Sequence, residues 1–320
     1  MKSIGIGTCV TVISGAAALG ASCGPTSTGA QGTPLVSHPD VPGTVFTIVL
    51  ENEDADNVIS PANPYIHQLA NQYGRPFAYT SSTHPSLPNY IMMTSGSLNG
   101  VINDSDPSYN VTVPGTSNLA DQLDAAGIPW RAYMESMGDA CTTESSGLYC
   151  AHHNPFLYYW NMRMNTDRCT RHIVDFDASF AADLAANTYR FMWITPNMCN
   201  DMHNCSTQTG DAWLAKVIPQ IMDSPGYKNG GAIFILTDEG NTRILGATAD
   251  LPIVVVSPNL ATTPYVTSTA FDHRSYLATV EDIFGMPRLG TTQDATSMDE
   301  FFRLADSGND AGSVDATQTP

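Results

Sequence analysis

Side chains that can bind metal ions or transfer protons follow three apolar runs of the chain. The runs are 45–50 (VFTIVL), 190–195 (RFMWIT) and 232–237 (AIFILT). The polar residues behind them are, in chain order, Glu51 and Asn52, then Asn197, Asp201 and His203, then Asp238 and Glu239. Carboxylate and amide oxygens suit hard divalent cations, and imidazole suits zinc, iron or manganese. The first and third sets therefore predict an oxygen-rich metal site, and Asp201, His203 and His273 form a mixed set able to hold a second ion.

Ser86 lies where a polar turn enters an apolar helix, in the segment 82–96 (STHPSLPNYIMMTSG). Pro88 suits a first helical position, and Ser86 is then close to a helix N-terminus, where backbone N–H groups stabilise a phosphoryl oxyanion. A serine hydroxyl becomes a strong nucleophile only when a metal or a base removes its proton. The simpler interpretation is that Ser86 only caps the helix. Thr83 and Ser95 fit the turn less well as nucleophiles.

The elements that must position these residues alternate along the chain. The three apolar runs, and a fourth at 252–257 (PIVVVS), are short and rich in β-branched and aromatic residues, which predicts strands of a parallel sheet buried on both faces. Helical stretches are expected at 64–72, 118–126, 178–186, 211–222 and 273–284. The pattern predicts an α/β fold, a three-layer α/β/α sandwich with a mostly parallel central sheet. In such folds the ligand site lies beyond the carboxyl ends of the strands.

Five blocks of the chain carry a family resemblance. They are LEN at 50–52, THPSLPNY at 83–90, NMCNDMH at 197–203 with GDAWL at 210–214, DE at 238–239, and DH at 272–273 with LATVE at 277–281. Their order and spacing, over roughly residues 46–290, resemble the phosphoesterase family of the alkaline-phosphatase superfamily, which includes bacterial acid phosphatases and phospholipases C. Within it, the chain is most similar to small secreted mycobacterial acid phosphatases that act on phosphatidylinositol 3-phosphate.

The resemblance implies a role for each matched residue. The ligands implied around one metal are Glu51, Asn52, Ser86, Asp238 and Glu239. Asp201, His203 and His273 then bind a second ion, or hold phosphate and move protons. His153 matches a family histidine that binds substrate, and Asn89 helps to neutralise the phosphoryl oxygens. One departure is that Gly240 and Asn241 follow Glu239, where relatives often continue with acidic residues.

The implied function is that of an exported, metal-dependent phosphoric monoester hydrolase of the acid phosphatase type. Ser86 forms a phospho-serine intermediate, one or two divalent cations are the cofactor, and a small phosphomonoester or a phosphoinositide is the substrate. One alternative is a phospholipase C, which cleaves a diester. Another is a non-catalytic surface lipoprotein built on a decayed hydrolase fold.

The composition agrees with a soluble exported protein. The 320 residues are 42% hydrophobic, and 13 basic against 31 acidic residues give a formal net charge of -18. Such a surface repels nucleic acid at long range, and no stable protein partner is inferred. The expected organisation is a signal peptide at 1–22, a flexible tether at 23–43, a phosphoesterase domain at 44–305 and a disordered tail at 306–320. Cys23 is a possible lipid anchor, and the protein is expected to be secreted, periplasmic or on the cell surface.

Export makes disulfides plausible for the seven cysteines. The expected short-loop pairs are Cys141 with Cys150 and Cys199 with Cys205, which leaves Cys169 unpaired. A zinc site from Cys199, His203 and Cys205 is an alternative. Elsewhere, Asp211 is expected to cap a helix that begins at residue 212, and His67 is expected to lie outside the site.

Overall fold

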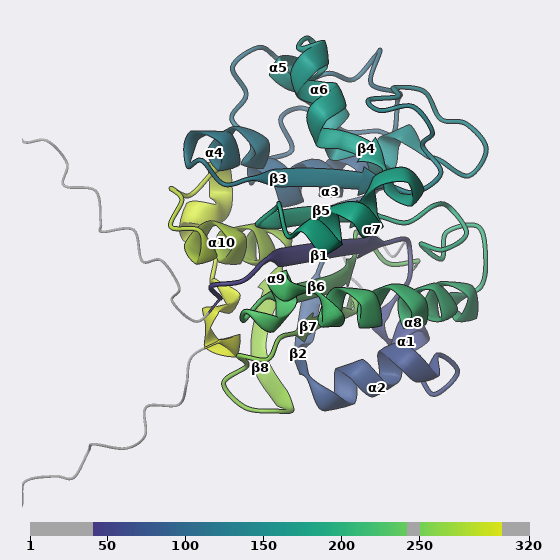
Figure 1. The fold of residues 1–320 in the computed structure, drawn as a ribbon, viewed down its shortest axis with the longest axis vertical. Helices are drawn as coiled ribbons and strands as arrows, with labels where there is room; N and C mark the ends of the chain where they lie inside the picture. Colours follow the sequence, from purple (N-terminus) through teal and green to yellow (C-terminus); the bar gives the residue numbers. More distant parts are fainter. Residues whose placement is uncertain (1–40, 242–249, 303–320) are drawn as a thin grey trace, which may run out of the picture. The chain divides into compact units, whose positions relative to one another are not determined.

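A computed structural model of the protein describes residues 41–241 and 250–302. Their central feature is an eight-stranded sheet in the order β4-β3-β5-β1-β6-β7-β2-β8 (Figure 1). The strands are β1 (Val45–Leu50), β2 (Gly74–Thr80), β3 (Trp130–Met134), β4 (Ile173–Asp175), β5 (Phe191–Thr195), β6 (Ala232–Thr237), β7 (Ile253–Val256) and β8 (Tyr265–Asp272). Neighbouring strands pair in parallel except for β7, which is antiparallel to both β6 and β2. The predicted mostly parallel sheet is confirmed.

The three neighbouring strands β5, β1 and β6 in the middle of the sheet are the ones that the apolar runs predicted. All residues of β1, β5 and β6 are buried. The fourth run also forms a strand, β7, but with reversed direction. The sequence did not predict β2, β3, β4 and β8. The edge strand β8 alternates between exposed and half-buried residues over most of its length, so it lacks a continuous apolar run.

Helices cover both faces of the sheet (Figure 1), as the three-layer prediction requires. The longer ones are α2 (Pro64–Gln72), α3 (Ser86–Ser95), α4 (Leu119–Ala125), α7 (Phe176–Ala186), α8 (Thr207–Asp223) and α10 (His273–Ile283). Shorter helices are α1 (Ala55–Val58), α5 (Trp160–Arg163), α6 (Thr166–His172), α9 (Pro225–Lys228), η1 (Ala151–His153), η2 (Pro155–Tyr158), η3 (Gly290–Asp294) and η4 (Met298–Phe301).

Strand β1 shows how the two faces are separated. Val45 and Val49 pack into one hydrophobic cluster with residues of α3, α4 and α10. Phe46 and Ile48 pack into the other with residues of α2, α7 and α8. Successive strand side chains point to opposite faces of a sheet, so one continuous apolar run serves both layers.

Two local predictions about helix starts were wrong. Helix α3 begins at Ser86 itself, which makes Pro88 the third helical residue rather than the first. Helix α8 begins at Thr207, so Asp211 lies inside it and does not cap it. The Asp211 carboxylate instead accepts hydrogen bonds from the backbone N–H groups of Tyr65 (3.1 Å) and Ile66 (2.7 Å). It therefore caps α2 from a neighbouring helix, a tertiary contact that local sequence does not reveal.

The disulfides confirm one predicted pair and correct the other. Cys199 is bonded to Cys205 as predicted. Cys141 is bonded to Cys169, not to Cys150, which is a buried free thiol. The Cys141 N–H donates to the carbonyl of Ile173, the first residue of β4, and α6 with Cys169 ends just before that strand. The bridge therefore links two cysteines that are 28 residues apart in the sequence. The predicted Cys141–Cys150 pair is wrong, because the contact of Cys141 with the start of β4 brings it close to Cys169.

The predicted signal peptide, Cys23, nearly all of the tether and the predicted tail lie outside the described residues. Among the residues that are described, no helix is both long and apolar enough to cross a membrane.

Candidate active site

The parallel pairing of β1 with β6 brings the first and third polar sets together. Leu50 is in register with Thr237, so the residues that follow each strand emerge side by side. The backbone N–H of Asp238 donates to the Leu50 carbonyl, and that of Asn52 donates to Asp238 Oδ1 (3.3 Å). The predicted oxygen-rich cluster is therefore formed at the carboxyl edge of the sheet.

Ser86 faces this cluster from the first position of α3. Its Oγ lies 3.2 Å from Glu51 Oε2 and 3.3 Å from Asn52 Oδ1, and the residue is buried. The backbone N–H of the next residue, Leu87, is already used, because it donates to Asp104 (2.9 Å). Ser86 thus joins the cluster as predicted, while part of the helix N-terminus behind it is occupied by the protein's own carboxylate.

The cluster contains more acceptors than donors. The Asn52 amide atom that faces Ser86 also lies 3.2 Å from both Glu51 Oε2 and Glu239 Oε1. Asp238 Oδ2 is buried without a hydrogen-bond partner. Burial raises the pKa of Glu51 well above its ordinary value, and the nearby Asp238 and Asp201 raise it further. Two arrangements satisfy such a group of oxygens: the amide nitrogen of Asn52 turned inward, or a cation between the oxygens. The donor set fits a hard divalent cation.

The turn before Ser86 contributes two further contacts to Glu239. His84 Nδ1 lies 2.8 Å from Glu239 Oε2, and Asn89 Nδ2 donates to the same oxygen (3.3 Å). Asn89 also closes the turn, because its Oδ1 accepts from the N–H groups of Ser82 and Thr83, both at 3.1 Å. The predicted substrate-binding residue Asn89 is therefore committed to the turn and to Glu239.

The second polar set meets the first through backbone and side-chain contacts. The Glu51 N–H donates to the Asp201 carbonyl (2.8 Å). His153 is buried, and its Nδ1 lies 3.4 Å from both Glu51 Oε1 and Asp201 Oδ2. Burial lowers the pKa of His153 to about 3, which favours a neutral imidazole. Asp201 and His153 therefore line the same cluster as Glu51.

His203 occupies the outer side of this set. Its backbone N–H donates to Asp201 Oδ1 (2.8 Å), its exposed ring contacts Asn204, and the ring centre is 5.7 Å from that of His153. It is the predicted catalytic histidine with direct access to solvent.

His273 is placed differently from His203. It is the first residue of α10 and is fully buried; its Nε2 contacts the Asp238 carbonyl and its Nδ1 lies 3.0 Å from the Tyr79 hydroxyl. Both ring nitrogens are thus engaged behind the carboxylates. Burial lowers the pKa of His273 to about 4. The contact supports the backbone that presents Asp238 and Glu239.

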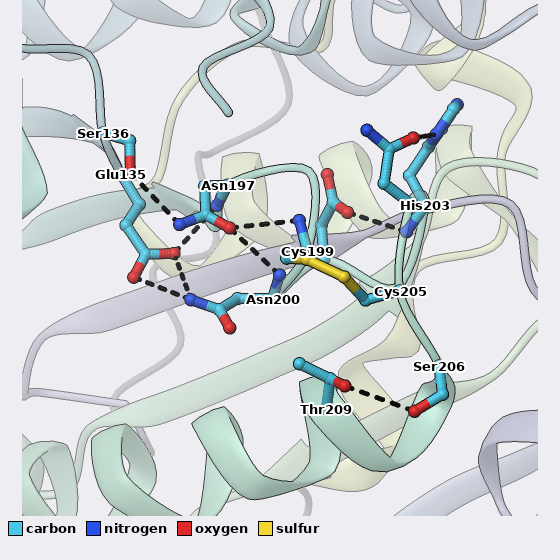
Figure 2. The surroundings of a disulfide bond; sticks show 11 residues. Glu135, Ser136, Asn197, Cys199, Asn200, His203, Cys205, Ser206 and Thr209 are labelled. Atoms are coloured by element: carbon cyan, nitrogen blue, oxygen red, sulfur yellow. Dashed lines mark hydrogen bonds between the residues drawn. A yellow bond between two sulfur atoms is a disulfide. The ribbon is translucent and has the colours of Figure 1, made fainter. Parts of the chain in front are cut away.

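A fixed loop carries Asp201 and His203. Figure 2 shows the Cys199–Cys205 disulfide that encloses both residues. At the base of the loop, Glu135 accepts from Asn197 N (2.8 Å), from Asn200 Nδ2 (2.9 Å) and from Trp213 Nε1 (3.0 Å). Asn197 is thus a loop residue, held at its N–H by Glu135, rather than a member of the oxygen cluster.

The Phosphoesterase family model matches residues 60–287. The chain belongs to this family.

Curated proteins similar to the chain include an acid phosphatase of Aspergillus fumigatus, 28% identical over an alignment of 263 positions that covers 77% of this chain and 55% of that protein. A probable acid phosphatase of Kluyveromyces lactis is 29% identical, over 77% of this chain and 59% of that protein. The phosphatidylinositol-3-phosphatase of Mycobacterium tuberculosis is 25% identical, over 78% of this chain and 80% of that protein. This chain thus spans just over half the length of the two fungal relatives.

Solved structures agree on the fold of this chain. A protein in the alkaline phosphatase superfamily from Vibrio parahaemolyticus has a TM-score of 0.54 at 11% identity, covering 77% of this chain and 67% of that one. A phosphonate monoester hydrolase from Silicibacter pomeroyi has a TM-score of 0.57 at 11% identity, covering 84% and 78%. The predicted alkaline-phosphatase-like fold is confirmed.

Two residues that contact or support the site were not predicted from the sequence. His84 contacts Glu239, and its position two residues before Ser86 was the available signal. Glu135 follows β3, a strand that was not predicted, so the rule that polar residues after strands form the site did not reach it.

Proposed function

We propose that this phosphoesterase is a metal-dependent phosphoric monoester hydrolase in which Ser86 is the nucleophile. The observation that carries the proposal is the position of Ser86 Oγ, within 3.3 Å of Glu51 and Asn52 at the start of a helix. The N-cap of α3 is Pro85, and the Leu87 N–H donates to Asp104, so Ser86 is not the capping residue of its helix. The hydroxyl faces the oxygen cluster instead.

Four residues would hold a divalent cation: Glu51, Asn52, Asp238 and Glu239. The buried Asp238 oxygen without a partner and the crowded Asn52 amide support this ligand set. A bound cation supplies positive charge that stabilises a serine alkoxide and the developing charge on the phosphoryl oxygens. Asp201 stays the predicted additional ligand, since its carboxylate and that of Glu51 lie equally close to the same His153 nitrogen.

The reaction proceeds in two displacements. Ser86 Oγ attacks phosphorus in line as the bond to the leaving oxygen breaks, and Glu51 Oε2, at 3.2 Å, is placed to accept the serine proton. His203 is on the solvent side and donates a proton to the leaving oxygen. Water then attacks phosphorus of phospho-Ser86, which releases inorganic phosphate and restores the serine hydroxyl.

The remaining predicted residues bind the substrate or position the side chains that react with it. His153 has two ring nitrogens without hydrogen-bond partners and is therefore the better candidate for holding a phosphoryl oxygen. The Asn89 amide is used within the turn and against Glu239, so its main contribution is to orient Ser86. We assign His273 the positioning of Asp238 in place of a proton transfer.

We propose phosphate monoesters as the substrate class and export as the destination. The acid phosphatases and the phosphatidylinositol-3-phosphatase among the relatives support the class. Two disulfides among the described residues suit an oxidising compartment. Phosphatidylinositol 3-phosphate is a possible lipid substrate within that class, although 13 basic residues against 31 acidic ones offer little attraction to an anionic bilayer.

The proposed function is tested by comparing kcat/KM for an aryl phosphate monoester with that for a matched phosphocholine diester. Both are assayed at mildly acidic pH with Mg²⁺, Mn²⁺ or Zn²⁺ supplied in turn. We expect turnover of the monoester to be faster by at least about tenfold, since its extra negative charge meets both the cation and an imidazole. Faster turnover of the diester would make the protein a phospholipase C. No turnover of either substrate with any ion would favour the non-catalytic alternative.

A further inference from the structure

Beside the oxygen cluster lies a group of sulfur and nitrogen ligands, of which the proposed reaction uses only His153. Cys150 is buried, belongs to neither disulfide, and precedes the 3-10 helix η1. Its Sγ lies 3.1 Å from a ring nitrogen of His152. One ligand atom from each of Cys150, His152 and His153 lies within 4.8 Å of the other two.

His153 gives independent evidence that a ligand belongs here. The residue is 1% exposed, and neither ring nitrogen has a hydrogen-bond partner. A buried imidazole nitrogen without a partner costs free energy, roughly 1 to 3 kcal/mol for an unsatisfied polar group. Its Nδ1 is 3.4 Å from two carboxylate oxygens, which is longer than a good hydrogen bond. A ligand that accepts an imidazole lone pair would remove this cost.

The donor types point to a borderline or soft cation. Thiolate and imidazole bind Zn²⁺ at about 2.3 and 2.0 to 2.1 Å, so tetrahedral ligand atoms are roughly 3.3 to 3.6 Å apart. The observed separations, from 3.1 Å to at most 4.8 Å, bracket this spacing. Hard ions such as Mg²⁺ prefer the oxygen ligands of the neighbouring cluster.

The group also has more exposed members and a candidate fourth ligand. His152 is half-buried, and its ring centre is 4.7 Å from that of His153. The exposed His203 ring is 5.7 Å from the His153 ring between centroids, which makes it the candidate fourth ligand. His152 and His203 are thus the more exposed histidines, whereas His153 is buried.

We propose that Cys150, His152 and His153 form a second metal site, selective for a thiophilic divalent cation such as Zn²⁺, at the edge of the catalytic cluster. The site is separate from the Glu51, Asn52, Asp238 and Glu239 ligand set and differs from it in ligand chemistry. Its effect on activity rests on the proposed function: an ion that engages His153 removes this imidazole from phosphate and inhibits hydrolysis.

The binding claim is tested on the full-length protein with Co²⁺ as the probe, in the presence of saturating Mg²⁺. We expect a near-ultraviolet thiolate-to-cobalt charge-transfer band that saturates at one equivalent. Cys150→Ser should abolish it and His152→Gln should weaken Co²⁺ binding by more than about tenfold. Cys23→Ser is the matched control and should keep the band, since Cys23 is not one of the three proposed ligands.

Each of the remaining outcomes supports or overturns the proposed metal site. Cys150→Ala, checked for native circular dichroism, replaces Cys150→Ser if the serine variant does not fold. No band in the wild-type protein, or an undiminished band in both Cys150 variants, would overturn the site. Zn²⁺ should inhibit the wild-type enzyme at least about tenfold more strongly than Cys150→Ser, and equal inhibition would overturn the inhibitory role. Because the band needs no turnover, a saturable band in a protein that hydrolyses no ester would keep this site while rejecting the proposed function.

Discussion

Two sets of buried carboxylates in this chain differ in what surrounds them. Glu281 on α10 accepts hydrogen bonds from Leu289 N (2.7 Å), Thr292 Oγ1 (2.8 Å) and Gln122 Nε2 (3.2 Å). Glu51 accepts from the hydroxyls of Tyr90 and Ser86 but also faces Asp238, which has one oxygen without a hydrogen-bond partner. Burial raises the pKa of all three side chains. The comparison shows that burial alone does not mark a site; a carboxylate matched by donors holds structure, and carboxylates turned toward each other suit a cation.

The largest effect on activity is expected from Ser86, whose hydroxyl lies beside Glu51 in the active-site cluster. Ser86→Ala should lower kcat by at least about 10³-fold, because the proposed nucleophile is removed while its surroundings stay in place. Steady-state kinetics on an aryl monoester measures this. The matched control is Ser95→Ala, which removes another buried hydroxyl from the same helix. Comparable losses in both variants would mean that the helix, not the Ser86 oxygen, is what activity needs.

Asp238→Asn separates the two kinds of carboxylate most clearly. It should weaken binding of the catalytic metal and reduce activity by more than about 100-fold, since a charged ligand is lost. In chelator-treated protein at pH 8 it should instead raise the free energy of unfolding by about 1 to 2 kcal/mol, because a buried ionised carboxylate beside Glu51 is replaced by a neutral amide. Thermal unfolding with and without chelator gives both values. A variant that is less stable than wild type without metal would contradict the assignment of repelling carboxylates.

The two disulfides provide a second contrast between structure and site. For loops of 28 and 6 residues, the chain-entropy relation gives losses of about 3.6 kcal/mol for Cys141→Ser/Cys169→Ser and about 2.2 kcal/mol for Cys199→Ser/Cys205→Ser. Activity should respond in the opposite order, because the shorter loop carries Asp201 and His203. Denaturant unfolding and kcat/KM are measured on both double variants. Greater loss of activity from the Cys141–Cys169 change, at temperatures where both fold, would refute the positioning role of the short loop.

Glu281→Gln tests the donor-matched carboxylate through pH. Burial raises the pKa of Glu281 to about 7, and Arg288 and the three donors only partly oppose this. The folded state binds the Glu281 proton more tightly than the unfolded state, so the contribution of Glu281 to the free energy of unfolding is fully present below the unfolded pKa and is lost as pH rises to about 7. Glu281→Gln should remove this slope and be more stable than wild type at pH 8 by about 2 kcal/mol. An unchanged slope between pH 4.5 and 7 in the variant would show that Glu281 is not its source.

An element of the fold can be predicted from the sequence when local residue patterns determine it, and not when contacts between distant segments do. Strands β1, β5 and β6 were predictable, since a strand covered on both faces must be apolar throughout. Strand β2 begins Gly-Arg-Pro and β4 has three residues, so neither carries a strong pattern. The reversal of β7 and the Cys141–Cys169 pair arise from contacts between distant segments, which no local pattern specifies.

The same limit applies to the candidate site. Parallel strands end at one edge, so the meeting of Glu51, Asn52, Asp238 and Glu239 follows once the strands are known. The Asp201 loop also reached this edge as predicted, through the bond from Glu51 N to the Asp201 carbonyl. The engagement of both His273 nitrogens depends on Tyr79 in the unpredicted strand β2.

The central claim, that Ser86 attacks phosphorus, is tested most directly by trapping the covalent intermediate. The enzyme is mixed with a labelled aryl phosphate monoester, quenched in acid within the first turnovers and mapped by mass spectrometry. The mechanism predicts phosphate on Ser86 at a fraction of enzyme that rises with substrate and disappears when substrate is exhausted. It also predicts no label in Ser86→Ala and an unchanged label in Ser95→Ala. Rapid turnover with no label, or with phosphate on a histidine in place of Ser86, would contradict it.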